Sequence, residues 1–260
     1  MKNWSISKSV TKQEILNYLN HDRYYAAYAI GDLEPFFYQK STWHVARHEN
    51  RVESLTLLYN GLDPPALFLI GNLGGLRAIL NNIECPSQVY FTCLPEQLII
   101  TREFYYWEEL IPMWRMVLDR KNLCGPPVDC IRLSNEHNEQ VSNLIAGGDI
   151  SGFNIYQVGQ GIFYGIFSQG KLVAMSGTHI VSQTNNIAAI GNVFTHQDYR
   201  GLGYASRTTS AVVNELLGIG ITDIVLNVSK VNIPAIKIYE KLGFTKYCEF
   251  IEGKAYHIQQ

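Results

Sequence analysis

A glycine-bearing turn between a predicted strand and a predicted helix has the composition of an anion-binding site. The segment is VFTHQDYRGLGYA, residues 193–205, in which Arg200 stands directly before Gly201 and Gly203. Glycine lets the backbone approach a ligand closely, and the first turn of a helix has unpaired N–H groups with partial positive charge. The segment therefore predicts a cradle suited to a pyrophosphate, in which Arg200 adds charge or fixes the turn. A plain strand-to-helix turn with an exposed arginine is the alternative.

A second segment, NIPAIKIYEKLGF at residues 232–244, predicts a helix that carries a phenol. Asn232 is suited to cap this helix and Gly243 to end it. Helical spacing puts Asn232, Ala235 and Tyr239 on one face, with a small residue that leaves room beside the tyrosine. Tyr239 is thus a candidate proton donor, although a core aromatic with a satisfied hydroxyl has the same local pattern.

The elements around these segments alternate as in an α/β (α+β) fold. A hairpin turn, SQG at 168–170, joins two of the predicted strands. The alternation of strand and helix after residue 186 predicts a sheet with parallel neighbours and helices on its faces. The predicted strands are 161–168, 171–180, 186–195, 224–228 and 247–251, and the helices are 135–145, 203–217 and 232–242.

The first half of the chain reads as a second, smaller α/β region. Thr11-Lys-Gln-Glu14 predicts a capping box at the start of a helix. The cluster GNLGG, residues 71–75, lacks both the G-x-G-x-x-G order and a P-loop lysine, so a tight strand-to-helix turn is the better interpretation. A segment rich in glycine and proline, 121–128, is the candidate linker between a domain at 1–127 and a domain at 128–260. The other predicted elements are a helix at 23–33 and strands at 43–46, 54–59, 66–70, 88–93 and 107–118.

Residues 192–244 together resemble the acetyl-CoA site of the GNAT N-acetyltransferases. The two family motifs occur in order and on the expected elements, as Arg200-x-x-Gly203-x-Ala205 and as Asn232-x-x-Ala235-x-x-x-Tyr239-x-x-x-Gly243-Phe244. The resemblance implies a GNAT-like mixed, partly parallel central sheet flanked by helices from about Cys130 onward. The preceding region is then either a degenerate GNAT-like copy or an added domain that shapes the acceptor site.

The resemblance also implies a role for each matched residue, with acetyl-CoA as co-substrate and no metal. The backbone of the strand end would pair with the pantetheine arm, the amides of the glycine turn would hold the pyrophosphate, and Asn232 would contact the cofactor arm. Tyr239 would act as the general acid that protonates the leaving thiolate. The implied cofactor-binding residues are Val193, Phe194, Thr195, Arg200, Gly201, Leu202, Gly203, Tyr204, Ala205, Asn232 and Tyr239.

The general base is where the sequence departs from the family. Many members carry a glutamate on the strand before the turn, at a position that matches about Asn192 here, and no acidic residue lies between Gln183 and Gln197. His196, Asp198 or an ordered water are the open substitutes. The resemblance implies an N-acetyltransferase in which a primary amine attacks the thioester directly. A longer acyl donor and a non-catalytic, CoA-binding regulatory module are the alternatives.

Composition limits the remaining possibilities. The 260 residues are 47% hydrophobic and 17% charged, with a net charge of −2 and no basic block, so we expect a globular protein without nucleic-acid partners. No run of about 18 apolar residues predicts a membrane helix. Five irregularly spaced cysteines indicate reduced thiols and a cytoplasmic location. We expect a small-molecule or peptide amine as acceptor, and a homodimer is an open option.

Overall fold

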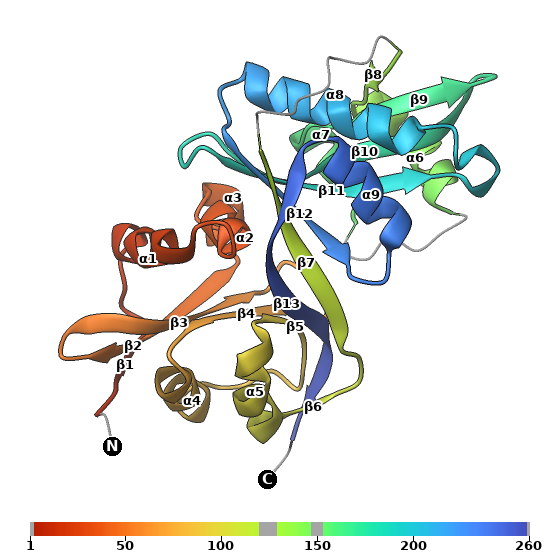
Figure 1. Cartoon of the computed structure of the whole chain (residues 1–260). Helices are drawn as coiled ribbons and strands as arrows, with labels where there is room; N and C mark the ends of the chain where they lie inside the picture. The colour runs from red at the N-terminus through yellow and green to blue at the C-terminus, as the bar shows by residue number, and fades with distance from the viewer. Residues whose placement is uncertain (1–2, 120–128, 147–152, 259–260) are drawn as a thin grey trace. The chain divides into compact units, whose positions relative to one another are not determined.

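The computed structural model divides the chain into two compact units (Figure 1). The first unit is Met1–Trp114 together with Cys248–Gln260, and the second is Arg115–Tyr247. The domain boundary expected at 127 and the linker expected at 121–128 lie outside the described residues, so that division stays a prediction. The structure describes residues 3–119, 129–146 and 153–258.

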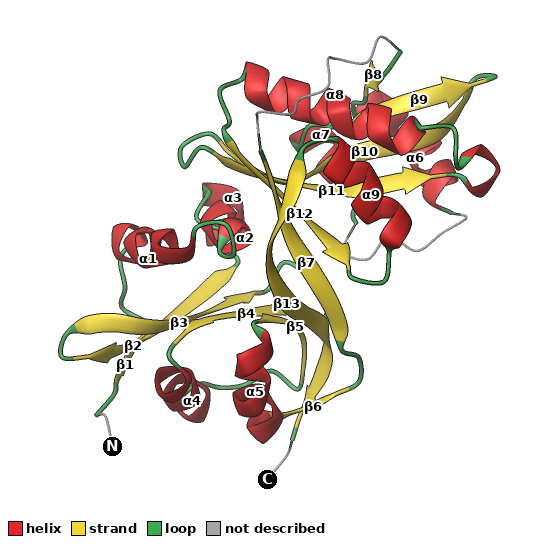
Figure 2. Cartoon of the chain, viewed as in Figure 1, coloured by secondary structure: helices red, strands yellow, loops and turns green. Residues whose placement is uncertain are grey.

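The first unit is a mixed sheet with helices (Figure 2). Its strands follow the order β1-β2-β3-β4-β5-β13, and β6 pairs with β13. Among the described residues the neighbouring strands pair antiparallel, except for β4 and β5, which are parallel and are joined through α4. The elements are β1 (Ser5–Ser7), α1 (Lys12–Leu19), α2 (Ala27–Gly31), α3 (Pro35–Tyr38), β2 (Ser41–His48), β3 (Arg51–Tyr59), β4 (Ala66–Gly71), α4 (Leu73–Asn82), β5 (Gln88–Cys93), α5 (Leu98–Phe104), β6 (Tyr105–Trp107), the start of β7 (Ile111–Leu118) and most of β13 (Phe244–His257).

Local signals account for some of these elements, and tertiary contacts for others. Thr11 caps α1 as predicted, because its side chain accepts a hydrogen bond from the Glu14 amide at 3.2 Å. The helix expected over 23–33 is wrong in length, since only α2 is α-helical there. Asp22 explains the late start, because its carboxylate accepts from the Tyr25 amide in a local turn. The strand expected over 107–118 is two strands, β6 and β7, and α5 was not predicted.

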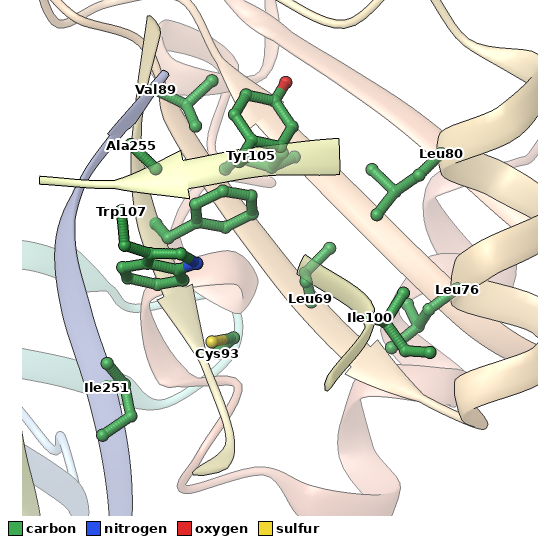
Figure 3. Close-up of a cluster of buried hydrophobic side chains, with 12 residues drawn as sticks. Leu69, Leu76, Leu80, Val89, Cys93, Ile100, Tyr105, Trp107, Ile251 and Ala255 are labelled. Atoms are coloured by element: carbon green, nitrogen blue, oxygen red, sulfur yellow. The ribbon is translucent and has the colours of Figure 1, made fainter. Parts of the chain in front are cut away.

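An aromatic cluster forms the centre of the first unit's core, on the side of the sheet covered by α4 and α5 (Figure 3). The Phe91 ring stacks on Trp107 with centroids 5.0 Å apart and meets Tyr105 edge-on at the same distance. The Trp107 indole N–H donates to the Thr101 hydroxyl at 3.0 Å, so the buried polar atom is satisfied. The Tyr105 hydroxyl likewise donates to the Pro86 carbonyl at 3.2 Å. The cluster therefore buries large rings without leaving these two donors unpaired.

Phe91→Ala should lower the free energy of unfolding of the first unit by about 3–5 kcal/mol, because it leaves a cavity between two fixed rings. Phe91→Leu, which retains most of the volume, should cost less. The measurement is urea unfolding monitored by tryptophan fluorescence. This signal reports the unfolding of the first unit, because all four tryptophans lie in it. An unchanged midpoint for Phe91→Ala would show that the ring cluster contributes little to stability.

The second unit is also a mixed sheet between helices. Its strand order is β13-β7-β12-β11-β10-β9-β8, where β7 and β13 contribute the residues that belong to this unit. The strands β8 to β11 pair antiparallel, and β11 and β12 are parallel, as the alternation of elements predicted. The further elements are β8 (Ile131–Arg132), α6 (Asn138–Ile145), α7 (Gln157–Gln160), β9 (Tyr164–Ser168), β10 (Lys171–Ser182), β11 (Ile187–Thr195), α8 (Tyr204–Gly218), β12 (Asp223–Ser229) and α9 (Ile233–Lys241).

The faces of this second sheet follow from neighbouring residues of β10. Ser176 forms hydrogen bonds to side chains of α8, whereas Met175 belongs to the apolar cluster that includes α6 and α7. A Cβ on Gly177 would overlap the ring of Phe163, which belongs to that same cluster. Since successive side chains of a strand point to opposite faces, α8 covers one face and α6 and α7 cover the other.

The two units repeat one topology. In the first, the antiparallel pair β3–β4 is followed by α4 and the parallel strand β5. In the second, the antiparallel pair β10–β11 is followed by α8 and the parallel strand β12. The first half of the chain therefore has the arrangement expected of a second copy of the fold.

Three further features concern the described residues only. No helix among them is both long and apolar enough to cross a membrane. No group of three or more histidine, cysteine, aspartate or glutamate side chains within the described ranges is placed to hold a metal ion. Three of the described cysteines are free thiols, namely Cys85, Cys93 and Cys130.

Candidate functional site

The turn between β11 and α8 leaves the start of the helix open. Gly201 and Gly203 have φ of +80° and +78°, the left-handed region that favours glycine. A Cβ at either position would find no heavy atom within 4 Å. Gly203 is the N-cap of α8 and supplies no side-chain hydrogen bond. The first intrahelical bond runs from the Arg207 amide to the Gly203 carbonyl, so the amides before it have no acceptor in the helix.

Three of the other described helices, α1, α4 and α9, are capped by side chains. Thr11, Asn72 and Asn232 each accept a hydrogen bond from an amide in the first turn of α1, α4 and α9, respectively. The amides at the start of α8 therefore lack the side-chain partner that these three helices have, and the two glycines before them add no side chain. Such an arrangement can bind an anion through backbone donors.

Arg200 fixes the turn. Its Nε donates to the carbonyl of Thr195, the last residue of β11, at 3.3 Å, while the side chain lies at the surface. Leu202, between the glycines, is 57% exposed and makes the turn's outer surface apolar. Of the two roles that the sequence left open for Arg200, this hydrogen bond supports fixing the turn, and the exposed guanidinium still carries its charge.

A buried hydroxyl cluster anchors α8 to the sheet. Ser176 Oγ lies 2.7 Å from Thr208 Oγ1 and 3.0 Å from Thr209 Oγ1, and all three residues are fully buried. Thr208 Oγ1 also bonds to the Tyr204 carbonyl at 3.1 Å. These bonds hold the first turns of α8 on β10. The cluster was not predicted, because serine and threonine carry no signal for a partner some 30 residues away.

The strand before the turn is interrupted at Asn192. Gly177 pairs with Gly191 and Met175 pairs with Phe194, so three steps along β11 face two along β10. Asn192 has a φ of +53°, which is uncommon for a residue other than glycine and marks a bulge. This bulge lies in the stretch whose backbone was expected to receive a cofactor arm.

The bulge also coincides with the end of the pairing between β11 and β12. Among the described residues the parallel register runs from Ile187 with Asp223 to Ile190 with Leu226. The predicted binding residues Val193, Phe194 and Thr195 lie beyond it, and each is partly exposed. Backbone groups on this side of β11 are therefore free of the ladder and can pair with an extended ligand.

Asn192 itself is buried, with 4% exposure. Its Nδ2 donates to Gln157 Oε1 at 3.3 Å, whereas its Oδ1 has no hydrogen-bond partner among the described residues. The hydroxyl of Thr195 is buried and unpartnered in the same way. A buried polar atom without a partner costs free energy, so both atoms are candidates for bonding to a ligand.

Tyr239 projects from α9 into a buried environment. Its ring is 7% exposed and lies edge-on to Phe244, with centroids 6.2 Å apart. Burial raises the pKa of the Tyr239 phenol to about 12, so the hydroxyl keeps its proton at neutral pH. No hydrogen bond joins this hydroxyl to another described residue, which speaks against the alternative of a satisfied core tyrosine. Asn232, which precedes the first residue of α9, is exposed. It caps the helix through its Oδ1, which accepts a hydrogen bond from the Ala235 amide at 3.2 Å.

His196 and Asp198, the two side chains that could replace the missing carboxylate, interact with each other in the loop after β11. His196 Nδ1 accepts from the Asp198 amide at 3.4 Å and lies 3.7 Å from the Asp198 carboxylate. His196 thus caps the short 3-10 turn at Gln197–Tyr199. The Asp198 side chain is largely exposed. Both residues have a structural task in the loop, and neither is buried at the bulge.

The equivalent turn of the first unit is filled by protein. Asn72 Oδ1 accepts from the Gly74 amide at 2.8 Å and so caps α4. A Cβ on Gly74 would lie 3.3 Å from the Trp4 indole nitrogen, and one on Gly75 would overlap Ser54. The GNLGG cluster is therefore the tight packed turn that its sequence predicted, without the open amides of the second unit.

The second unit thus fits a CoA pyrophosphate on its own geometry, through an uncapped helix start and two left-handed glycines with free space before them. The same unit also resembles known proteins. Residues 135–244 match the family model described as the acetyltransferase (GNAT) family. No curated protein is significantly similar to the chain.

Solved structures share the fold over the whole chain. A tandem GNAT protein from the clavulanic acid biosynthesis pathway, solved without acetyl-CoA, is 14% identical with a TM-score of 0.60, and the match covers 100% of both chains. A GNAT-family acetyltransferase from Colwellia psychrerythraea is 12% identical with a TM-score of 0.60 over 98% of this chain and 100% of that one. A Drosophila protein is 13% identical with a TM-score of 0.64 over 92% and 88%.

Identities this low show a common fold and leave the substrate unassigned. The tandem relative accounts for the first unit as a second GNAT-like region, and the mixed, partly parallel sheet flanked by helices is confirmed. Residues 135–244 therefore match the acetyltransferase (GNAT) family as a domain, in a chain that has the fold of a tandem GNAT protein.

Proposed function

We propose that this protein is an N-acetyltransferase that moves an acetyl group from acetyl-CoA to a primary amine by direct attack on the thioester. The observation that carries the proposal is the uncapped start of α8 behind Gly201 and Gly203, together with the buried, protonated Tyr239 of α9 in the same unit. These residues are the ones at which the chain matches the family motifs. The acceptor is a small-molecule or peptide amine, and the proposed location is the cytoplasm.

Each part of the chain has a task in this proposal. The amides of Arg200–Ala205 bind the pyrophosphate, and the backbone of Val193–Thr195 pairs with the pantetheine arm. When bound, acetyl-CoA supplies an activated thioester carbonyl. Tyr239 holds a proton at its Oη that can be given to the leaving sulfur, because a pKa of about 12 keeps the phenol neutral until then.

Two alternatives keep the same cofactor turn. A transferase for a longer acyl group would need room beside the thioester that acetyl transfer does not need. A CoA-binding regulatory module would bind the cofactor without turnover, which the absence of an acidic residue between Gln183 and Gln197 would suit. The protonated hydroxyl of Tyr239, which has no hydrogen-bond partner among the described residues, favours the enzyme over the module.

Isothermal titration of the purified protein with acetyl-CoA, CoA and a long-chain acyl-CoA tests the donor. We expect acetyl-CoA to bind at least as tightly as the long-chain ester. An amine panel followed by release of free CoA thiol then tests the reaction. Preference for the long chain would favour the first alternative, and binding without thiol release would favour the second. No binding of any of the three would overturn the proposal.

A further inference from the structure

Two bulges of opposite sense lie close together on β10 and β11. On β11 the extra residue falls between the pairs Gly177–Gly191 and Met175–Phe194. On β10 the extra residue is His179, because Thr178 pairs with Ile190 and Ile180 pairs with the next residue along, Ala189. The second bulge restores the register that the first one shifts. A bulge changes the direction in which a side chain points, and these two bulges lie on the strands beside the expected thioester site.

The bulge on β10 brings the His179 ring onto β11. A Cβ placed on Gly191 would overlap the Cδ2 and Nε2 atoms of His179, so the ring edge that carries Nε2 lies directly against the Gly191 backbone. Any residue larger than glycine at position 191 would displace the imidazole. Gly191 is adjacent to Asn192, whose buried Oδ1 has no hydrogen-bond partner in the described part of the chain. A ring nitrogen and an unpaired carbonyl oxygen thus lie at neighbouring positions of β11.

Both side chains lie on the same face of the sheet. Gly191 is paired with Gly177, and the Cβ position of Gly177 points to Phe163 in the cluster of α6 and α7. The Asn192 amide bonds to Gln157, the first residue of α7. The shared face is therefore that of α7, opposite the face covered by α8.

We propose that His179 accepts the proton of the attacking amine and that the Asn192 carbonyl orients that amine, in place of the carboxylate that the β11 strand lacks. The inference rests on the proposed acetyl transfer and names the residues that handle its nucleophile. His179 is the proton acceptor, and Asn192 is a positioning residue.

The surroundings keep His179 in the form that can accept a proton. Burial lowers the pKa of His179 to about 4, so the imidazole is neutral at physiological pH. The helix α7 and the strand β11 contain no charged residue, and Tyr164 is the only titratable residue of β9. On α6 the charged residue is Glu139, which is exposed. A neutral ring has a nitrogen lone pair that can take up a proton from an amine whose acidity rises as it bonds to the carbonyl carbon.

The transfer balances with these groups. The amine nitrogen uses its lone pair to form the bond to the acyl carbon, and the electron pair of the C–S bond leaves with sulfur. One N–H proton passes to Nε2 of His179, while the other N–H donates a hydrogen bond to Asn192 Oδ1. The Oη proton of Tyr239 passes to sulfur to give the free thiol. His179 then releases its proton to solvent and Tyr239 regains one, so no other reactant is required.

The test uses His179→Gln and Asn192→Gly in the full chain. Glycine removes the side-chain amide of Asn192, and it adopts the positive φ at this position without strain. We expect His179→Gln to lower kcat by about 100-fold, the lower range for a lost general base, with the Kd of acetyl-CoA within about two-fold of wild type. The loss should be largest for strongly basic amines, whose nitrogen gives up its proton least readily after it bonds to the acyl carbon, and small for a weakly basic amine such as hydroxylamine, a pattern that structural damage alone would not produce. Asn192→Gly should raise the KM for the amine more than it lowers kcat.

Two further histidines serve as controls. His196→Gln tests the loop histidine as the base, and His21→Gln, an exposed residue of the first unit, should leave turnover unchanged. If His179→Gln does not fold, His179→Asn repeats the test with a smaller side chain. Wild-type turnover by His179→Gln, or a loss confined to His196→Gln, would overturn the inference and leave the proposed function intact. A wild-type protein that binds acetyl-CoA but acetylates no amine would overturn the proposed function itself, and this inference with it.

Discussion

Gly203→Asp should weaken acetyl-CoA binding by about 100-fold, or about 2.7 kcal/mol. The wild-type residue has a φ of +78° and free space at its Cβ position, so an aspartate would place its carboxylate before the amides at the start of α8. That carboxylate would occupy the position proposed for the pyrophosphate and would repel it. Isothermal titration measures the change, and circular dichroism checks that the fold is retained.

Gly203→Asn is the matched control for this variant. Asparagine and aspartate have nearly the same shape, and both tolerate the left-handed region better than most residues. The difference between the two variants therefore isolates the charge, and it should shrink as salt is added. Equal affinities of Gly203→Asp and wild type would show that the pyrophosphate binds elsewhere.

Tyr239→Phe should lower kcat by about 100-fold and leave the Kd of acetyl-CoA nearly unchanged. Phenylalanine keeps the edge-on contact with Phe244 and removes only the hydroxyl, which has no partner among the described residues. Because the pKa of Tyr239 is raised to about 12, wild-type kcat should not fall through loss of this proton as the pH rises to about 10, the ordinary tyrosine value. Single-turnover measurement of thiol release, across that pH range, separates chemistry from product release.

Tyr247→Phe is the control, since Tyr247 lies in the same unit and is 45% exposed. It should leave kcat as in wild type. Turnover by Tyr239→Phe equal to wild type at every pH would remove this residue from the acid role and assign protonation of the sulfur to water. Weaker acetyl-CoA binding with unchanged kcat would instead make Tyr239 part of the binding surface.

The sequence predicted best where one residue type meets a local backbone requirement. Gly203 adopts the positive φ that its position before α8 suggested, and Asn232 caps α9 as expected. Thr11 likewise caps α1, but the reciprocal half of the capping box does not form. Glu14 instead pairs with Arg47 of β2 at 2.7 Å, because a tertiary partner competes with the local one.

Tertiary structure decided the features that depend on strand pairing. The strand β7 lies between β12 and β13 in the sheet order, although the alternation of elements gave no reason to place it there. A side-chain hydrogen bond joins β13 to β7 within the second unit, because the Thr245 hydroxyl at the start of β13 donates to the Val117 carbonyl of β7. Such pairings are fixed by which faces are buried together, and a local pattern of residues is compatible with several of them.

The same division runs through the candidate site. The chain alone determined the anion-binding turn and the phenol, because a left-handed glycine and a helical spacing are properties of a few consecutive residues. Only the folded sheet brought His179 to Gly191, 12 positions later, and left the side-chain carbonyl of Asn192 without a partner among the residues that the structure describes. The physical reason is that a bulge shifts the register of two strands against each other. Its cost and its position depend on the packing of both faces and are not encoded in either strand by itself.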